Sequence, residues 1–515
     1  MHRFLGRRFY VSAGATTASV VLLANSESAR QDLKFTYHAF RRSSSVVLTL
    51  SKCVWEYRTT LNAKYPSEKA RDTALSSCHS RCAEITRKAI EQNAGIFIKL
   101  GQHINALTYI FPEEWTSAMI PLLDQCPESS YKSIETLFIQ DTGKSINDFF
   151  SSFDEKPLAA ASLAQVHLAT LNGSNEKVAV KVQHPSLQQF VPLDIQLTEM
   201  IFNLVDYFFP EYPLTWLSQE MRRSIFVELD FREEAMNSEK TRNYFAPYYN
   251  KTALRVPIVH WAEKRILCME YLPGIRPDNT KKLKEEHVNL KKLSTCLANI
   301  FNTMIFTKDV GLHCDPHAGN LAIRKCKNRQ GFEIVLYDHG LYRYIPSELQ
   351  LSYARFWLAL LDNDLPAMKA AAHDFAGVND ENFKIFAAAI TGRDFNEAID
   401  GSFLKKVRSG SEIEHMQQRL QDDSKLTSQI VQMLRRMPPT VLLILKTNDL
   451  VRCLDEKLGY PLGATRQFAI MANYCANTVY LEDINRGGKM NWIKSFAKYM
   501  IMKVKLAFLP YIEAI

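Results

Sequence analysis

The sequence lacks the features that mark several large classes of protein. Its ten cysteines are scattered and include no Cys-x-x-Cys pair, which argues against a disulfide scaffold and against a zinc ribbon. With 46% hydrophobic and 23% charged residues over 515 positions, the composition excludes a disordered chain and a membrane protein of many spans. A net charge of +8 is too small at this length to indicate nucleic-acid binding, and we expect no nucleic-acid partner.

The N-terminus lacks acidic residues. No Asp or Glu precedes Glu27, whereas several arginines lie close to the start. This composition is typical of a mitochondrial transit peptide, although a disordered basic tail would share it. The apolar run at 11–24 is shorter than the ~20 residues that cross a bilayer, so whether it anchors the chain stays open. We predict a mitochondrial targeting segment at 1–30, followed by a variable helical, membrane-proximal region at 31–85.

The middle of the chain changes from helical to β-type patterns. Residues 86–150 have mainly helical periodicity and predict a helical extension. Residues 164–171, an Asn-Gly turn and residues 178–182 predict a β-hairpin. Residues 194–244 then predict a long helical region.

A Pro-Gly pair at 273–274 predicts the boundary between two lobes. We therefore expect an N-lobe at 151–272 and a C-lobe with a helical C-terminal region at 273–515. The C-lobe pattern is mostly helical, except for a short buried strand at 333–337.

Three segments of the chain carry polar residues with the spacing of protein-kinase motifs, and they occur in the order found in kinases. Lys181 lies on the second hairpin strand among apolar neighbours, as the phosphate-binding lysine of a kinase does. His313, Asp315 and Asn320 have the H-x-D-x-x-x-x-N spacing of a kinase catalytic loop, in which Asp orients an acceptor hydroxyl and Asn binds metal. Asp338 leaves the 333–337 strand in an Asp-x-Gly sequence, the position of a kinase metal ligand. The order of these segments predicts a kinase-type fold.

An acidic segment in the intervening helical region supplies partners for Lys181. Asp230 and Glu234 are four residues apart and share one face of a helix, whereas Glu228 lies about 200° from Asp230 on a continuous helix. On this reasoning Glu228 points away from the site. A solvated acidic stripe is the alternative for the whole segment.

Glycine is absent between residues 143 and 173, where a protein kinase carries its glycine-rich loop. Three segments are distinctive: the loop Ala159-Ala160-Ala161-Ser162, the helix Lys99-Leu100-Gly101-Gln102 and the pair Glu228-x-Asp230. Together they resemble the UbiB family of atypical protein-kinase-like proteins, also called aarF-domain-containing kinases. The resemblance runs from about residue 90 to at least 345.

The resemblance implies an α+β fold that is bilobed and protein-kinase-like, with a small mixed N-lobe sheet, a mainly helical C-lobe and an N-terminal helical extension. It also implies that Lys181 pairs with Glu234 and touches nucleotide phosphates. Asn320 and Asp338 would hold Mg²⁺, and Asp315 would take the place of the catalytic aspartate. The expected cofactors are ATP or ADP with Mg²⁺.

Further contacts follow from the same resemblance. The helix from Lys99 to Gln102 is expected to lie across the nucleotide cleft, with Lys99 reaching Glu228, so that a protein substrate is blocked. Nucleotide contacts are expected from the loop Ala159, Ala160, Ala161 and Ser162 and from the hinge residues Glu270 and Tyr271.

The alanine loop has a consequence that follows from backbone geometry alone. Glycine allows backbone N–H groups to approach phosphates at dihedral angles that alanine avoids. We therefore expect residues 159–161 to hold a triphosphate more loosely, which makes ordinary protein phosphorylation suspect.

The eukaryotic branch of the family is linked to coenzyme Q and mitochondrial lipid homeostasis. Together with the targeting composition, the resemblance implies a mitochondrial, inner-membrane-associated atypical kinase or ATPase. Its expected partners are an adenine nucleotide, inner-membrane lipids and coenzyme Q or its precursors; the sequence identifies no protein partner. The stretch 492–509 carries lysines and no acid among apolar residues, which suits either an anionic lipid surface or a last helix docked on the C-lobe.

Two alternatives stay open. One is a small-molecule kinase of the aminoglycoside or choline kinase type, which shares the catalytic-loop spacing but needs an open acceptor cleft. The other is a non-catalytic scaffold or carrier that binds nucleotide or lipid.

Overall fold

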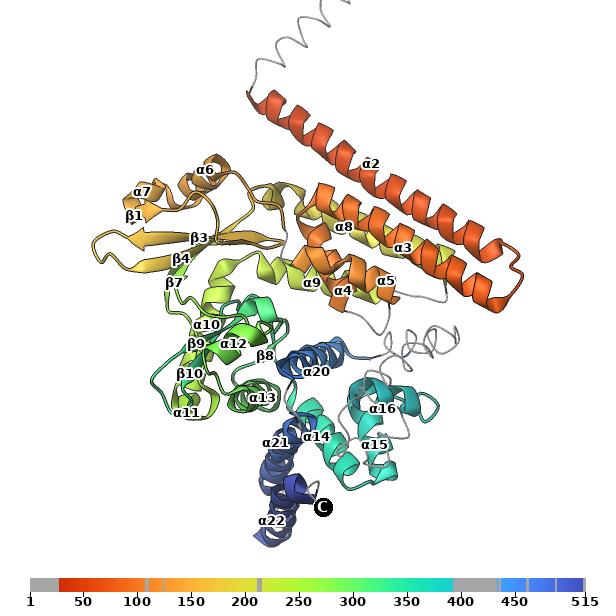
Figure 1. Ribbon diagram of the computed structural model, residues 1–515, viewed down its shortest axis with the longest axis vertical. Helices are drawn as coiled ribbons and strands as arrows, with labels where there is room; N and C mark the ends of the chain where they lie inside the picture. Colours follow the sequence, from red (N-terminus) through yellow and green to blue (C-terminus); the bar gives the residue numbers. More distant parts are fainter. Residues whose placement is uncertain are drawn as a thin grey trace, which may run out of the picture.

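The computed structural model describes residues 27–106, 111–123, 126–210, 215–391, 433, 437–459, 463–486 and 489–512 (Figure 1). Residues 1–26 of the predicted targeting segment, with the apolar run at 11–24, lie outside the described residues, and residues 27–30 are helical. Among the helices that are described, none is long and apolar enough to cross a membrane. None of the ten cysteines forms a disulfide, as their spacing predicts.

Helices form the N-terminal part of the described chain. α2 (Glu27–Asn62) and α3 (Glu68–Asn93) pack against each other as a hairpin. The chain leaves α3 through Ala94 and Gly95, which both have positive φ, and enters α4 (Ile96–Ala106), whose apolar side is buried. α5 (Glu113–Ala118) and the short helix η1 (Ile120–Leu123) pack against α4.

The N-lobe contains a six-stranded sheet in the order β1-β3-β4-β7-β6, with β2 paired to β3. All of its strand pairs are antiparallel, so the sheet is small as expected but not mixed. The predicted hairpin is confirmed as β3 and β4, with Gly173 at a φ of 83° in the turn. The strands are β1 (Phe150–Phe153), β2 (Ala159–Ala160), β3 (Ala164–Leu171), β4 (Lys177–Gln183), β6 (Val259–Ala262) and β7 (Ile266–Glu270).

The two faces of β4 contact different helices because its side chains alternate in direction. Val178, Val180 and Val182 are fully buried with the apolar residues of α6 (Tyr131–Thr142). Ala179 lies on the other face and packs with Phe231 of α10 (Phe231–Phe245). This alternation directs Lys181 toward α10.

The C-lobe is mainly helical with two small sheets (Figure 1). β10 (Phe332–Leu336) pairs with β5 (Leu254–Arg255) in parallel and with β9 (Leu321–Lys325) in antiparallel fashion. β8 (Leu312–His313) pairs with β11 (Tyr342–Arg343). The predicted strand at 333–337 is thus confirmed within one residue, and the bilobed α+β fold class is confirmed with it.

Helices make up most of the C-lobe, and α13 (Leu290–Phe306) contacts the short strand β8. α13 is buried along most of its length and contacts α20 and α21, and α21 contacts α22. The C-lobe helices are α12 (Thr280–Glu285), α13 (Leu290–Phe306), α14 (Ser347–Leu361), α15 (Leu365–Ala376), α16 (Phe383–Thr391), α20 (Pro439–Leu458), α21 (Gly463–Arg486) and α22 (Lys489–Ile512). α11 (Tyr249–Thr252) precedes the predicted boundary at 273–274 but packs against α13.

Candidate functional site

A largely buried lysine joins the two lobes. Lys181 Nζ donates hydrogen bonds to both carboxylate oxygens of Glu234, at 2.6 and 2.9 Å, and to Oδ2 of Asp338 at 2.9 Å. The Lys181 side chain is 13% exposed and lies 5.0 Å from the ring centroid of Phe231. Burial disfavours the ammonium, but Asp338 and Glu234 outweigh it and raise the Lys181 pKa. We call Lys181, Glu234 and Asp338 the nucleotide-side network.

Asp338 is held at the end of β10 by backbone and histidine contacts. Its Oδ1 accepts a hydrogen bond from the Gly340 N–H at 2.9 Å, and its carbonyl accepts one from His313 Nε2 at 2.8 Å. Burial opposes ionisation of Asp338, but Lys181 outweighs it and lowers the Asp338 pKa. The residue between Asp338 and Gly340 is His339, whose pKa burial lowers to about 3, so its ring is neutral and packs internally.

The catalytic-loop motif folds into one compact turn. The Asp315 N–H donates to His313 Nδ1 at 3.1 Å, so the His313 proton lies on Nε2, the atom that donates to Asp338. The Asn320 amide Nδ2 donates to the Asp315 carbonyl at 3.0 Å, which leaves its oxygen as the atom suited to a metal. The spacing of the motif therefore reflects two sets of hydrogen bonds: Asn320 bonds directly to Asp315, and His313 joins Asp315 to Asp338.

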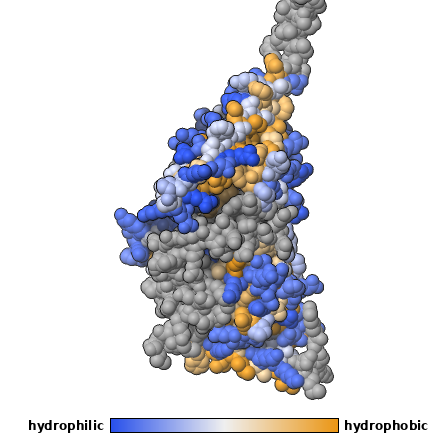
Figure 2. All heavy atoms as spheres, turned by 90° about the vertical axis from the view of Figure 1, so that its right-hand side faces the viewer, coloured by the Kyte–Doolittle hydropathy of each residue, from blue (hydrophilic) through white to orange (hydrophobic). Residues whose placement is uncertain are grey.

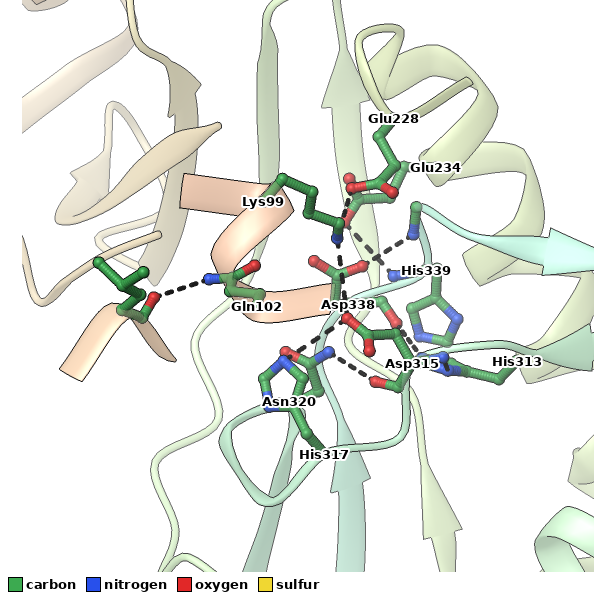
Figure 3. A network of polar contacts seen from close by, with 12 residues as sticks. Lys99, Gln102, Glu228, Glu234, His313, Asp315, His317, Asn320, Asp338 and His339 are labelled. Carbon is green, nitrogen blue, oxygen red and sulfur yellow. Dashed lines mark hydrogen bonds and ion pairs between the residues drawn. The ribbon is translucent and has the colours of Figure 1, made fainter. Parts of the chain in front are cut away.

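A second lysine reaches the same loop from the N-terminal helices. Lys99 Nζ on α4 lies 2.9 Å from Oε2 of Glu228 and 3.8 Å from Oδ2 of Asp315. Figure 3 shows Lys99, Glu228, Asp315 and Asp338 gathered between α4 and the catalytic loop. Burial opposes the charged form of Lys99, but Glu228 and Asp315 outweigh it and raise the Lys99 pKa. We call Lys99, Glu228 and Asp315 the lid-side network.

An interruption between two helices explains how Glu228 and Glu234 both reach the site. α9 (Thr215–Glu228) ends at Glu228, and α10 begins at Phe231. Asp230 is the N-cap of α10 and accepts a hydrogen bond from the Arg232 N–H at 3.1 Å. The expectation that Glu228 points away was wrong, because it assumed one continuous helix. Asp230, which that reasoning favoured, is paired with Arg232 instead.

Comparisons with known proteins identify the family of this chain. Residues 121–372 match the family model described as the ABC1 atypical kinase-like domain. The ABC1 family protein MCP2 of Saccharomyces cerevisiae is 48% identical over 92% of this chain and 84% of its own length. The chain belongs to the ABC1 family. This is the UbiB or aarF-domain family that the motifs predict.

Two further relatives of the ABC1 family align over most of their length. The ABC1 family protein MCP2 homolog of Schizosaccharomyces pombe is 44% identical over 90% of this chain and 83% of its own length. The AarF domain-containing protein kinase 1 of Gallus gallus is 34% identical over 85% of this chain and 82% of its own length. The family similarity therefore includes the N-terminal helices that supply Lys99.

The alanine loop of this ABC1 protein forms a tight hairpin. Ala159 and Ala160 make up β2, and the Ala161 N–H donates to the Ala164 carbonyl at 2.7 Å. The Ala161 carbonyl accepts a hydrogen bond from His184 Nε2 at 3.0 Å, and Ser162 is buried. At Ala161, therefore, both backbone groups form hydrogen bonds within the protein.

The hinge residues are also partly engaged. The Glu270 carboxylate accepts two hydrogen bonds from Arg255, and its backbone N–H donates to the Ile258 carbonyl at 2.8 Å. Tyr271 follows directly and is partly exposed. A contact from Glu270 to adenine would therefore use its carbonyl oxygen.

Gln102 lies outside both networks, although it belongs to the same motif as Lys99. Its amide donates to the Leu122 carbonyl at 2.9 Å and so fastens α4 to η1 (Figure 3). Gly101 serves the same contact, because a Cβ there would lie 2.3 Å from a methyl carbon of Leu122. Within the motif, Lys99 thus contacts the site, whereas Gly101 and Gln102 set the position of α4.

Sequence reasoning missed Lys446. Its Nζ lies 3.0 Å from Oδ1 of Asp315, and it comes from α20, beyond the residues that match the ABC1 domain. The only signal is a single lysine that follows the apolar run 441–445. Such a lysine is common on amphipathic helices, so the sequence alone did not distinguish it.

Proposed function

We propose that this ABC1 protein binds an adenine nucleotide with Mg²⁺ and acts as an atypical kinase or ATPase in coenzyme Q or mitochondrial lipid homeostasis. The nucleotide-side network carries the proposal. Lys181, Glu234 and Asp338 come from three separate elements and meet through bonds of 2.6 to 2.9 Å. This is the lysine–glutamate–aspartate arrangement that phosphoryl transfer in kinases requires.

The residues divide the work of phosphoryl transfer. Lys181 binds the α- and β-phosphates, with Glu234 holding its ammonium in place. Asp315 orients the attacking hydroxyl or water and accepts its proton as the new P–O bond forms and the bond to ADP breaks. His313 fixes the positions of Asp315 and Asp338 relative to each other, because its two ring nitrogens bond to the backbone of both residues.

The residues present fit Mg²⁺. Asp338 is ionised, because Lys181 lowers its pKa. The Nδ2 of Asn320 donates to the Asp315 carbonyl, so the side-chain oxygen of Asn320 is the atom available to a metal. One carboxylate and one amide oxygen suit Mg²⁺, which is usually bound by few protein ligands together with substrate phosphates and water. When bound, Mg²⁺ would neutralise charge on the phosphate oxygens.

Two exposed apolar surfaces support membrane association. On α2, Leu33, Phe40 and Trp55 are each at least 70% exposed, and Figure 2 shows hydrophobic atoms on the upper part of the molecule, where Figure 1 places α2. On α22, Ile501 is 68% exposed although the same helix docks on α21 through its opposite side. α22 carries lysines and no acidic residue, so anionic inner-membrane lipid is the partner we propose for it.

One observation favours a second candidate, a nucleotide-binding scaffold with negligible turnover. Lys99 of α4 and Lys446 both lie within 4.0 Å of Asp315, the residue that we propose orients the acceptor, so α4 would cover the acceptor side. The same cover argues against an aminoglycoside-type kinase, which needs an open acceptor cleft.

Turnover of ATP by the purified protein separates these candidates. We expect hydrolysis that rises with cardiolipin-containing vesicles and falls at least ~100-fold in Asp338→Asn, since that change removes the anionic metal ligand. Asp374→Asn, at an exposed acid of α15 outside the site, is the matched control. Mg-nucleotide binding without hydrolysis in either condition would favour the scaffold.

The mitochondrial location is tested separately. We expect the full-length chain, expressed with a C-terminal fluorescent tag, to co-purify with the mitochondrial inner membrane. A chain that starts at residue 27 should lose this location. If the shortened chain reaches mitochondria equally well, the targeting proposal is wrong.

A further inference from the structure

Three consecutive residues of α20 contact the catalytic loop or its support, although α20 lies beyond the matched domain at 121–372. Lys446 Nζ lies 3.0 Å from Oδ1 of Asp315. The next residue, Thr447, is fully buried, and its hydroxyl donates to the His313 carbonyl at 3.4 Å. Asn448 donates to the hydroxyl of Tyr353 on α14. The helix therefore contacts the loop at the Asp315 carboxylate and at the His313 backbone carbonyl.

Lys446 pairs with Asp315, whereas Lys99 pairs with both Glu228 and Asp315. Lys99 lies closer to Glu228, at 2.9 Å, than to Asp315, at 3.8 Å. His317 Nε2 also lies 3.8 Å from Oδ2 of Asp315. Among the described residues, Asp315 is the only acidic residue within 4.0 Å of Lys446. Lys446 thus makes the shortest of the three contacts with the Asp315 carboxylate and contacts Oδ1, whereas the other two contact Oδ2.

The surroundings make this contact directional. The Lys446 side chain is 11% exposed, and Leu443, one turn earlier on the same helix, is buried. In such an environment a carboxylate without its cation is costly, so the Asp315 carboxylate has one strongly preferred orientation. Phosphoryl transfer depends mainly on positioning and on fixed charge near the transferring group.

We propose that Lys446 is a positioning residue of the phosphoryl-transfer site, which fixes the Asp315 carboxylate so that its second oxygen faces the acceptor. This inference rests on the proposed function. It assigns a role in the reaction to the helical region that follows the ABC1 domain. It also separates the two lysines at Asp315, because Lys99 covers the acceptor side and Lys446 orients the carboxylate.

The test combines turnover with nucleotide binding in the full-length chain. Lys446→Met should lower kcat for ATP at least tenfold, while KM for ATP and the affinity for Mg-ADP stay within about threefold of wild type. Lys446→Arg keeps the positive charge and should recover most of the loss. Lys457→Met, at an exposed lysine on the same helix, should change nothing.

A second measurement does not depend on turnover. Urea unfolding of Lys446→Met, Asp315→Asn and the double variant should give a coupling between the two sites, as expected for residues in contact. Wild-type kcat in Lys446→Met, failure of Lys446→Arg to recover activity, or additive unfolding effects would each overturn the positioning role alone. If wild-type protein shows no Asp338-dependent turnover, the proposed function fails and this role fails with it.

Discussion

The nucleotide-side and lid-side networks have the same design but different origins. In each, one buried lysine bridges a glutamate near the junction of α9 and α10 and an aspartate of the C-lobe. Lys181 belongs to the N-lobe sheet, whereas Lys99 comes from a helix N-terminal to the matched domain. The first network is therefore built from the kinase-like fold itself, and the second is imposed on it by an added helix.

The difference suggests what each network does. The nucleotide-side lysine contacts its partners at 2.6 to 2.9 Å and has the position that binds phosphates in a kinase. The lid-side lysine contacts Asp315 only at 3.8 Å, so its main partner is Glu228. Removing the two lysines should therefore have different effects on ligand binding.

Replacing Lys99 should mainly affect the stability of the fold. Lys99→Met leaves Glu228 buried without its cation, which should lower the free energy of unfolding by about 3–5 kcal/mol. Affinity for Mg-ADP should stay within about threefold of wild type, because Lys99 makes no contact with Lys181. Urea unfolding and calorimetric titration measure the two quantities.

The matched control for that change is Lys88→Met. Lys88 is 62% exposed and pairs with Glu84 on α3, so its loss should cost less than about 1 kcal/mol. If Lys99→Met abolishes Mg-ADP binding while the protein stays folded, the proposed difference between the nucleotide-side and lid-side networks is wrong.

A smaller effect is expected at Asp230, which lies between the two glutamates but belongs to neither network. Asp230→Ala removes the N-cap of α10 and should cost about 1 kcal/mol of unfolding free energy. ATP turnover should be unchanged, because the carboxylate is engaged with Arg232. Loss of turnover at full stability would place Asp230 in the chemistry and contradict this assignment.

The sequence predicted the parts of the site that depend on local pattern. Alternating apolar residues and an Asn-Gly turn were sufficient for the β3–β4 hairpin, and this fixed the face on which Lys181 lies. The fixed spacing of His313, Asp315 and Asn320 reflects hydrogen bonds within one loop. Such contacts join residues that are close in the chain, so a motif can record them.

Contacts that depend on helix ends or distant elements were harder to predict. Acidic residues at 228, 230 and 234 have the same composition whether the helix is continuous or broken, and the N-cap at Asp230 decides which of them faces the site. The contact between Lys446 and Asp315 spans 131 positions. Nothing in the local pattern at 446 indicates a partner so far away in sequence.

The central claim is that the nucleotide-side network binds Mg-nucleotide. Calorimetric titration of Mg-ADP into the wild-type protein, Lys181→Met and Lys177→Met tests it most directly, since Lys177 is an exposed lysine on the same strand. We predict that Lys181→Met binds at least tenfold more weakly, a loss of about 1.4 kcal/mol or more, and that Lys177→Met binds as wild type does. Equal affinities in all three folded proteins would contradict the account.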